Sequence, residues 1–137
     1  MESFILDSSV TMGWAFVNQK NDLSAKARLI LENGGTAYVP EHWMLEVINS
    51  LIVAERRKMM VSYGVTHFCG ILKDMDIIFE INTPFTHHEA VILLAREHTL
   101  SSYDAAYLEL AFRKGLPLAT RDEALRKTAK KIGVRLL

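Results

Sequence analysis

The sequence has few of the features that mark secreted or membrane proteins. Of its 137 residues only Cys69 is a cysteine, so no disulfide can form within the chain. The longest purely apolar run, Ala90 to Ala95, is too short to span a membrane, and no basic start followed by a long apolar stretch indicates a signal peptide. We therefore expect a cytoplasmic protein without a membrane partner.

Neither sign of charge is in excess over the whole chain, because 16 Lys and Arg residues balance 16 Asp and Glu residues. The balance hides an asymmetry, since residues 1–112 carry 8 basic and 14 acidic residues and residues 113–137 carry 8 basic and 2 acidic ones. The basic segment is compatible with a bound polyanion and equally with a solvated helix face.

A short apolar run near the start predicts the centre of a sheet. Phe4-Ile5-Leu6 is typical of a strand covered on both faces, as in the middle of a parallel sheet. Asp7 follows directly, so it is predicted at the carboxyl end of that strand. In open α/β sheets this edge is where ligands bind.

Strands and helices are expected to alternate along the rest of the chain. The predicted helices cover residues 8–20, 22–33, 40–57, 65–73, 88–97, 100–114 and 122–132, and further strands cover 37–39, 77–81, 116–119 and 134–137. The alternation predicts a parallel sheet with helices on both faces, and the length and 50% hydrophobic content fit a single domain over residues 1–137.

One predicted helix is apolar over most of its circumference. At about 100° per residue, His42, Asn49 and Ser50 lie near Glu46 in one narrow polar stripe. Such a helix is expected to be largely buried, with Glu46 facing a cleft, although a solvated stripe would give the same pattern.

Four acids stand where functional carboxylates are expected: Asp7, Glu46, Asp104 and Asp122. Each aspartate also has a structural alternative, because Asp7 could cap the following helix and Ser101-x-x-Asp104 and Thr120-x-x-Glu123 have capping-box spacing. Carboxylates gathered at one site repel unless a cation joins them. Oxygen ligands of this kind suit Mg²⁺ or Mn²⁺, and no Cys/His spacing suits Zn²⁺.

Four motifs in register resemble those of PIN-domain ribonucleases, in particular the VapC-like toxins of type II toxin-antitoxin pairs. They are Leu6-Asp7-Ser8-Ser9-Val10, Val39-Pro40-Glu41 with Glu46-Val47-Ile48-Asn49, Leu100-Ser101-Ser102-Tyr103-Asp104-Ala105-Ala106-Tyr107, and Leu118-Ala119-Thr120-Arg121-Asp122 with Leu125. The order, spacing and total length agree along the whole chain.

The resemblance implies a three-layer α/β/α PIN domain with a five-stranded parallel sheet and a Mg²⁺- or Mn²⁺-dependent endoribonuclease site. It assigns catalysis and metal binding to Asp7, Glu46, Asp104 and Asp122, with Ser9, Asn49 and Thr120 in support. Glu123 or a supporting role for Asp122 stays open at the fourth position. Arg121, Arg126 and Lys127 are the candidates for contact with the RNA backbone.

The resemblance also implies partners: an RNA substrate, a cognate antitoxin and a second toxin copy in a homodimer. Two other functions remain to be weighed against a toxin. One is a PIN nuclease in RNA processing, and the other is a PIN-like module that binds RNA or protein without cutting. A phosphoacceptor receiver domain would need an aspartate after the third strand, where the chain has Asn82-Thr83-Pro84.

Overall fold

The computed structural model describes residues 2–137, and its centre is a parallel sheet. The strands are Ser3–Leu6 (β1), Thr36–Pro40 (β2), Ile77–Glu80 (β3) and Leu118–Ala119 (β4), in the spatial order β3-β2-β1-β4. The prediction for the first strand is confirmed, because β1 lies inside the sheet and its Phe4, Ile5 and Leu6 side chains have no exposed surface.

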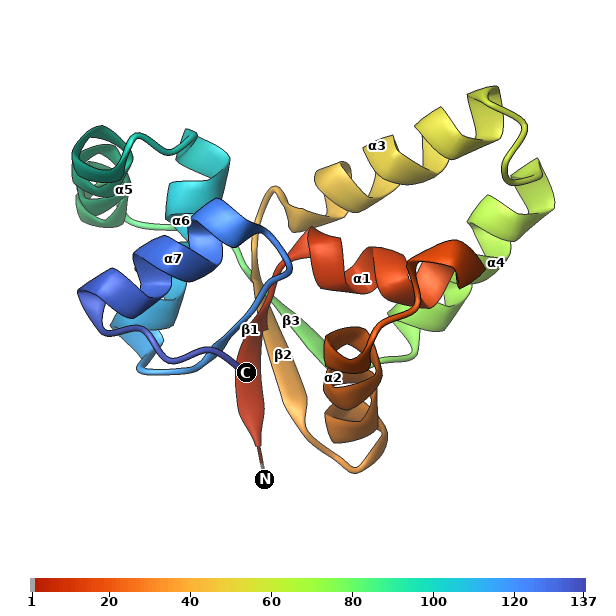
Figure 1. Cartoon of the computed structure of the whole chain (residues 1–137), viewed down its shortest axis with the longest axis horizontal. Helices are drawn as coiled ribbons and strands as arrows, with labels where there is room; N and C mark the ends of the chain where they lie inside the picture. Colours follow the sequence, from red (N-terminus) through yellow and green to blue (C-terminus); the bar gives the residue numbers. More distant parts are fainter. Residues whose placement is uncertain (1) are drawn as a thin grey trace.

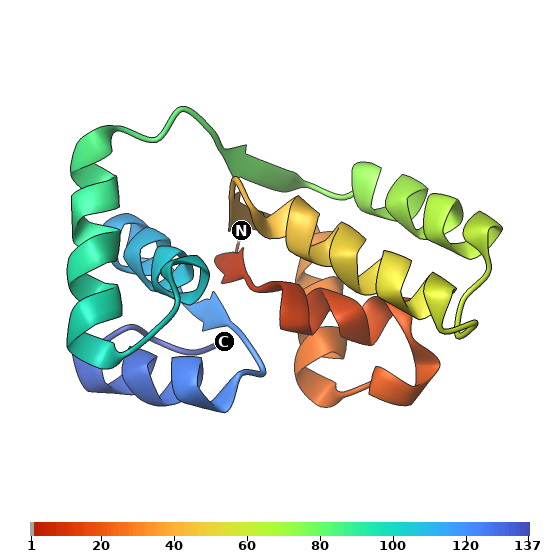
Figure 2. The ribbon, with the colours of Figure 1, turned by 90° about the horizontal axis from the view of Figure 1, so that it is seen from above.

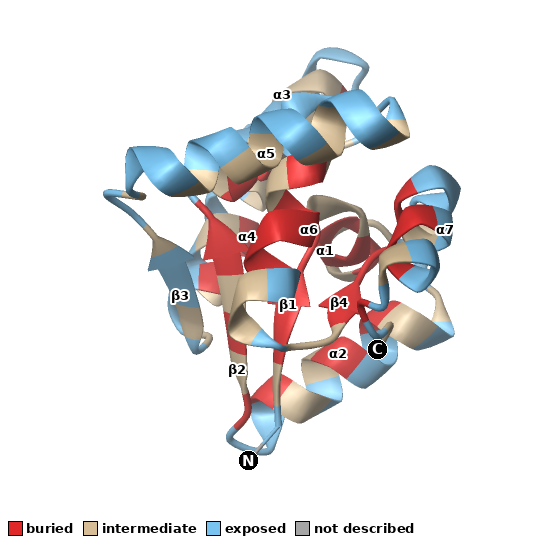
Figure 3. Ribbon diagram, turned by 90° about the vertical axis from the view of Figure 1, so that its left-hand side faces the viewer, coloured by how far each residue is buried: buried red, intermediate tan, exposed pale blue. Residues whose placement is uncertain are grey.

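Helices cover both faces of this sheet, as predicted. Ser8–Ala15 (α1), Asp22–Glu32 (α2), Trp43–Arg56 (α3) and Ser62–Lys73 (α4) lie on one side, and Phe85–His98 (α5), Ser102–Lys114 (α6) and Glu123–Ile132 (α7) lie on the other (Figures 1 and 2). Figure 3, which is coloured by burial, shows β1 among the buried elements. A short 3-10 helix (η1) covers Val17–Gln19. Within residues 2–137, none of the helices combines the length and the apolar character needed to cross a membrane.

The expected fifth strand is reduced to one bridge. Residues 134–137 pair only at Leu136, which lies beside Leu118 of β4. Backbone hydrogen bonds join Leu118 N to Arg135 O (2.8 Å) and Leu137 N to Leu118 O (3.0 Å). The pairing stops there because β4 is only two residues long before the chain turns toward α7, so the sheet of the described residues has four strands and not five.

Several predicted helix bounds are also corrected. The helices expected from residues 65 and 88 each begin three residues earlier, at Ser62 and Phe85. The helix expected over residues 8–20 ends at Ala15, because Phe16 takes an extended backbone conformation (φ −119°, ψ 125°). The helix expected from Pro40 begins at Trp43, and Pro40 instead closes β2 opposite Glu80. A proline has no N–H to donate to the ladder, so the end of a strand suits it.

The sheet order creates a switch point beside β1. The chain leaves β1 for β2 on one side and returns through β4 on the other. Leu6 is in register with Ala119, so the residues that follow the two strands, Asp7 and Thr120, meet at the same edge. This carboxyl edge of β1 and β4 is where an α/β sheet of this kind binds its ligand.

Candidate active site at the carboxyl edge of the sheet

Asp7 is the buried acid at the centre of this edge. Its side chain is only 5% exposed and does not cap α1, although Asp7 is the residue at the helix N-terminus. Oδ2 of Asp7 instead accepts hydrogen bonds from Ser9 Oγ (2.7 Å) and Thr120 Oγ1 (2.6 Å). The capping role considered for Asp7 is therefore wrong, because its carboxylate bonds the two hydroxyls and not the helix.

The same two hydroxyls tie the β1–α1 junction to the β4–α7 loop. Ser9 Oγ accepts a hydrogen bond from the Arg121 backbone N–H (3.0 Å), and Thr120 Oγ1 accepts one from the Asp122 N–H (3.1 Å). Each hydroxyl thus donates to Asp7 and accepts from the loop. The position of Asp7 relative to Asp122 is fixed by this network, although 115 residues separate them in the sequence.

Asp122 combines a capping role with a place at the site. Its Oδ1 accepts a hydrogen bond from the Leu125 N–H (2.8 Å), which makes Asp122 the N-cap of α7. The Thr120-x-x-Glu123 capping box is therefore wrong, because Thr120 turns inward to Asp7. Asp122 keeps Oδ2 for other contacts.

Glu46 projects from the first turn of α3 toward the same edge. The Tyr107 hydroxyl, on α6, donates a hydrogen bond of 2.5 Å to Glu46 Oε1. His42 Nε2 lies 3.5 Å from the same oxygen, which is too long for a good hydrogen bond, so we take Tyr107 as the partner that orients Glu46. The side chain is one-third exposed, as expected for a group at the edge of a cleft.

Asp104 lies in the first turn of α6, one residue after the exposed Tyr103. The side chain of Ser101 caps this helix by accepting a hydrogen bond from the Asp104 backbone N–H (3.1 Å). The capping bond uses the backbone of Asp104 and leaves its carboxylate available. Asp104 is half-buried, at the end of the helix that also carries Tyr107.

Three of the four acids have raised pKa values. Burial raises the pKa of Asp7, and the nearby charge of Asp122 raises it further. Burial also raises the pKa of Asp104, to which Asp122, Asp7 and Glu46 all add, and the pKa of Glu46 is raised by burial and by Asp7. Burial is the largest cause in each case, and the added contributions from neighbouring carboxylates indicate that these acids repel one another.

The donor set suits a hard divalent cation, although the acids are not closed around one. Among residues 2–137, no three His, Cys, Asp or Glu side chains stand close enough together to hold a single metal ion. Mg²⁺ commonly takes only one or two protein carboxylates and keeps several waters, with substrate phosphates completing its shell. A cation held in that way would relieve the repulsion between Asp7 and its neighbours, so the residues present fit Mg²⁺ or Mn²⁺.

The other predicted site residues are spread around this cluster. Asn49 lies one turn beyond Glu46 with its side chain exposed, beside Met12 and Gln19. Arg121 and Lys127 are exposed, whereas the guanidinium of Arg126 donates to the Thr120 carbonyl (2.9 Å). Arg126 was a candidate for contact with RNA. In the structure, one of its N–H groups holds the β4–α7 loop through this bond.

Sequence reasoning missed the partner of Glu46. Tyr107 is fully buried and bonds an acid 61 residues away. The sequence does contain an indication of this role. Tyr107 comes three residues after Asp104, and residues i and i+3 share one face of a helix. His42, whose ring makes edge contacts with Tyr103 and Tyr107, stays neutral because burial lowers its pKa.

The structure defines a class of protein. It is a parallel α/β domain with carboxylates at the switch point of its sheet. The chain belongs to the PIN-domain family, whose model matches residues 4–131. No curated protein matches the sequence.

Two solved structures share the fold. The chain is similar to PAE2754 from Pyrobaculum aerophilum (TM-score 0.63, 19% identity, covering 90% of this chain and 82% of that one). It is also similar to VapC20 from Mycobacterium tuberculosis, a toxin that cleaves the sarcin-ricin loop (TM-score 0.64, 15% identity, covering 91% and 94%). At these identities the likeness concerns the fold.

Proposed function

We propose that the protein is a Mg²⁺- or Mn²⁺-dependent endoribonuclease. The observation that carries the proposal is the cluster of Asp7, Glu46, Asp104 and Asp122 at the carboxyl edge of β1 and β4, where each of the first three has a raised pKa. Membership of the PIN-domain family supports it. A non-catalytic binding module would have no need to hold mutually repelling acids together.

The chain's own residues divide the work at the site. A divalent ion held there would supply a water of lowered pKa and stabilise the departing oxygen of a phosphodiester. Asp7, whose carboxylate is held by Ser9 and Thr120, would hold such an ion, together with Glu46, which Tyr107 orients.

Proton transfer is best assigned to Asp104. Its carboxylate is free of the capping bond, and its raised pKa favours taking a proton from the attacking water. Asp122 is the weaker candidate for this step, because Oδ1 already accepts the α7 capping bond.

We assign contact with the RNA backbone to the basic surface beside the acids. Arg121 is exposed, and its backbone N–H donates to Ser9 Oγ (3.0 Å), so the residue stands at the edge of the site. Its guanidinium reaches the Gln19 carbonyl (3.4 Å) at the end of η1. Lys127, Lys130 and Lys131 continue the positive charge along α7 and line one shallow depression with Arg126. Contacts of this kind make binding weaken steeply with salt, because each phosphate contact releases counterions.

Site variants with and without metal test the nuclease. Asp7→Asn and Asp104→Asn should each lower Mg²⁺-dependent cleavage of single-stranded RNA by at least about a thousandfold, whereas Asp74→Asn, an exposed acid at the end of α4, should not. EDTA should stop the wild-type reaction and Mn²⁺ should restore it. Cleavage by folded Asp7→Asn and Asp104→Asn proteins at the wild-type rate would refute the site.

We further propose that this nuclease is the toxin of a toxin-antitoxin pair, working as a homodimer that binds a cognate antitoxin. Its fold likeness to VapC20 supports this role over RNA processing outside such a pair. Expression of the wild-type chain should arrest growth, with new RNA 5′ ends, and Asp7→Asn should do neither. Cleavage in vitro without growth arrest would favour the processing role and leave the nuclease proposal standing.

A further inference from the structure

A pocket of about 470 Å³ lies next to the acid cluster and is not explained by it. Its walls come from α6, α5, the end of β3 and the start of α3. Apolar lining residues are Leu45, Val91, Ala106 and Leu110. The volume falls within the range of small-ligand sites, about 300–1,000 Å³.

The pocket and the candidate active site share a wall. Tyr103 and His42 line the pocket, and their rings meet edge to face with centroids 5.3 Å apart. Tyr103 directly precedes Asp104, and His42 lies one helical turn before Glu46. Because His42 Nε2 also lies 3.5 Å from Glu46 Oε1, the wall that His42 forms is next to one of the acids.

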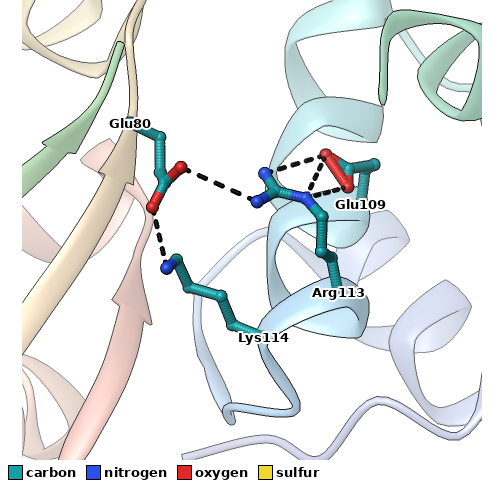
Figure 4. Close-up of polar contacts among 4 residues, drawn as sticks. All are labelled: Glu80, Glu109, Arg113 and Lys114. Atoms are coloured by element: carbon teal, nitrogen blue, oxygen red, sulfur yellow. Dashed lines mark hydrogen bonds and ion pairs between the residues drawn. The ribbon is translucent and has the colours of Figure 1, made fainter. Parts of the chain in front are cut away.

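The charged part of the lining, called the floor here, consists of Glu80, Glu109 and Arg113, and Lys114 pairs with Glu80 from outside the lining. Figure 4 shows the polar contacts among these four residues. Arg113 Nε donates to Glu109 Oε2 (2.8 Å), and Lys114 Nζ lies 2.8 Å from Glu80 Oε1. A longer contact of 3.6 Å joins Arg113 to Glu80 and links the two pairs. The formal charge of these two acids and two bases sums to zero.

This pairing decides which chemistry the pocket accepts. Arg113 is the only Lys or Arg among the described lining residues, and its guanidinium is already committed to Glu109 and Glu80. A phosphate entering the pocket would meet the exposed Glu41 and no unpaired arginine or lysine. The lining holds three acids (Glu41, Glu80 and Glu109) and one arginine, so it disfavours an anion. An uncharged, flat group whose N–H edges can donate to carboxylates suits this lining, between apolar and aromatic walls.

We propose that this pocket holds an unpaired nucleobase of the RNA, next to the phosphate that is cut, with the base stacked on Tyr103. The inference rests on the proposed nuclease function and adds to it the residues that would read the sequence. The ring of Tyr103 is free to stack because the residue is 58% exposed, while the contact with His42 holds it in place. Stacking on an aromatic side chain is a common way to bind single-stranded RNA.

Filling the pocket tests the proposal through base preference. Ala106→Phe places a ring in the pocket without changing an acid, and Ala25→Phe, on the exposed surface of α2, is the matched control. The substrate is a short RNA that contains one mapped cleavage position. We expect the wild type to cleave it about tenfold faster with one particular base at one flanking position than with the others. Ala106→Phe should reduce the preference to about twofold or less and Ala25→Phe should keep it.

A preference that survives in folded Ala106→Phe would overturn the pocket's role. Should Ala106→Phe fail to fold, Tyr103→Ala serves instead, because it removes the stacking surface at an exposed position. A full preference in Tyr103→Ala would equally overturn the proposal.

Nucleoside binding gives a second test that does not need cleavage. In metal-free protein followed by NMR, at least one of the four ribonucleosides should shift the amide signals of Val91, Tyr103 and Ala106, and Ala106→Phe should abolish the shifts. No shift with any nucleoside, or equal shifts with inorganic phosphate, would refute a base pocket even if RNA is cut. Shifts without any RNA cleavage would retain the pocket and refute the nuclease function instead.

Discussion

The hydrogen bond from Tyr107 to Glu46 should support both the stability and the activity of the protein. Tyr107→Phe removes only the hydroxyl of a fully buried ring, so the packing around it stays the same. The bond it loses has a carboxylate acceptor, and such bonds contribute about 1.5–3 kcal/mol. Because Glu46 is one-third exposed and water can replace part of the bond, we expect a loss near the lower limit, about 1.5 kcal/mol.

The loss is large enough to measure in two assays. About 1.5 kcal/mol changes the unfolding equilibrium constant by about tenfold, which urea denaturation resolves, and should lower the Tm by about 5 °C. The rate of RNA cleavage should fall by about tenfold, because Glu46 loses the contact that orients it. Burial raises the pKa of Tyr107 far above its ordinary value, so the hydroxyl remains a donor at every working pH and the effect should not vary between pH 6 and 9.

The control is Tyr63→Phe, at a tyrosine that is 76% exposed on α4. It makes the same chemical change away from the site and should leave stability and cleavage unchanged. If Tyr107→Phe is as stable and as active as Tyr63→Phe, the argument that this hydroxyl positions Glu46 is wrong.

Three further changes test the network, the floor of the pocket and the basic surface. Thr120→Val removes the donor to Asp7 and should lower the free energy of unfolding by about 2 kcal/mol in urea denaturation. Glu80→Gln should remove part of the acid sensitivity of the fold: Lys114 lowers the pKa of Glu80, so Glu80 stabilises the protein above its unfolded pKa, and this contribution is lost as pH falls through the lowered value. Arg121→Gln should reduce the slope of log K against log salt for RNA binding by about one.

Each change has a matched control at an exposed position. Thr66→Val on α4 removes a hydroxyl that bonds only a backbone carbonyl of its own helix, and it should cost far less than Thr120→Val. Glu89→Gln should leave the stability curve between pH 3 and 7 as it is. Lys26→Gln on α2 should leave the salt slope of RNA binding unchanged. Equal effects of a variant and its control would contradict the corresponding prediction.

The sequence by itself determined the elements that carry the acids. An apolar run followed by Asp7 predicted a buried strand with a carboxylate at its end, because a fully covered strand must be apolar on both faces. Capping of α6 by Ser101 was likewise readable, since an N-cap bond spans only three residues. The extent of strand pairing could not be predicted in the same way. The expected fifth strand pairs only through a single bridge at Leu136.

Only the tertiary structure decided what each acid contacts. The partners of Asp7 and Glu46 are Thr120, 113 residues away, and Tyr107, 61 residues away. Local patterns allowed Asp7 to cap α1 and Thr120 to cap α7, whereas the fold turned both side chains toward each other and made Asp122 the cap of α7. Local patterns fix bonds within one turn of a helix, but a side chain with two possible partners is assigned by the packing of elements distant in the sequence.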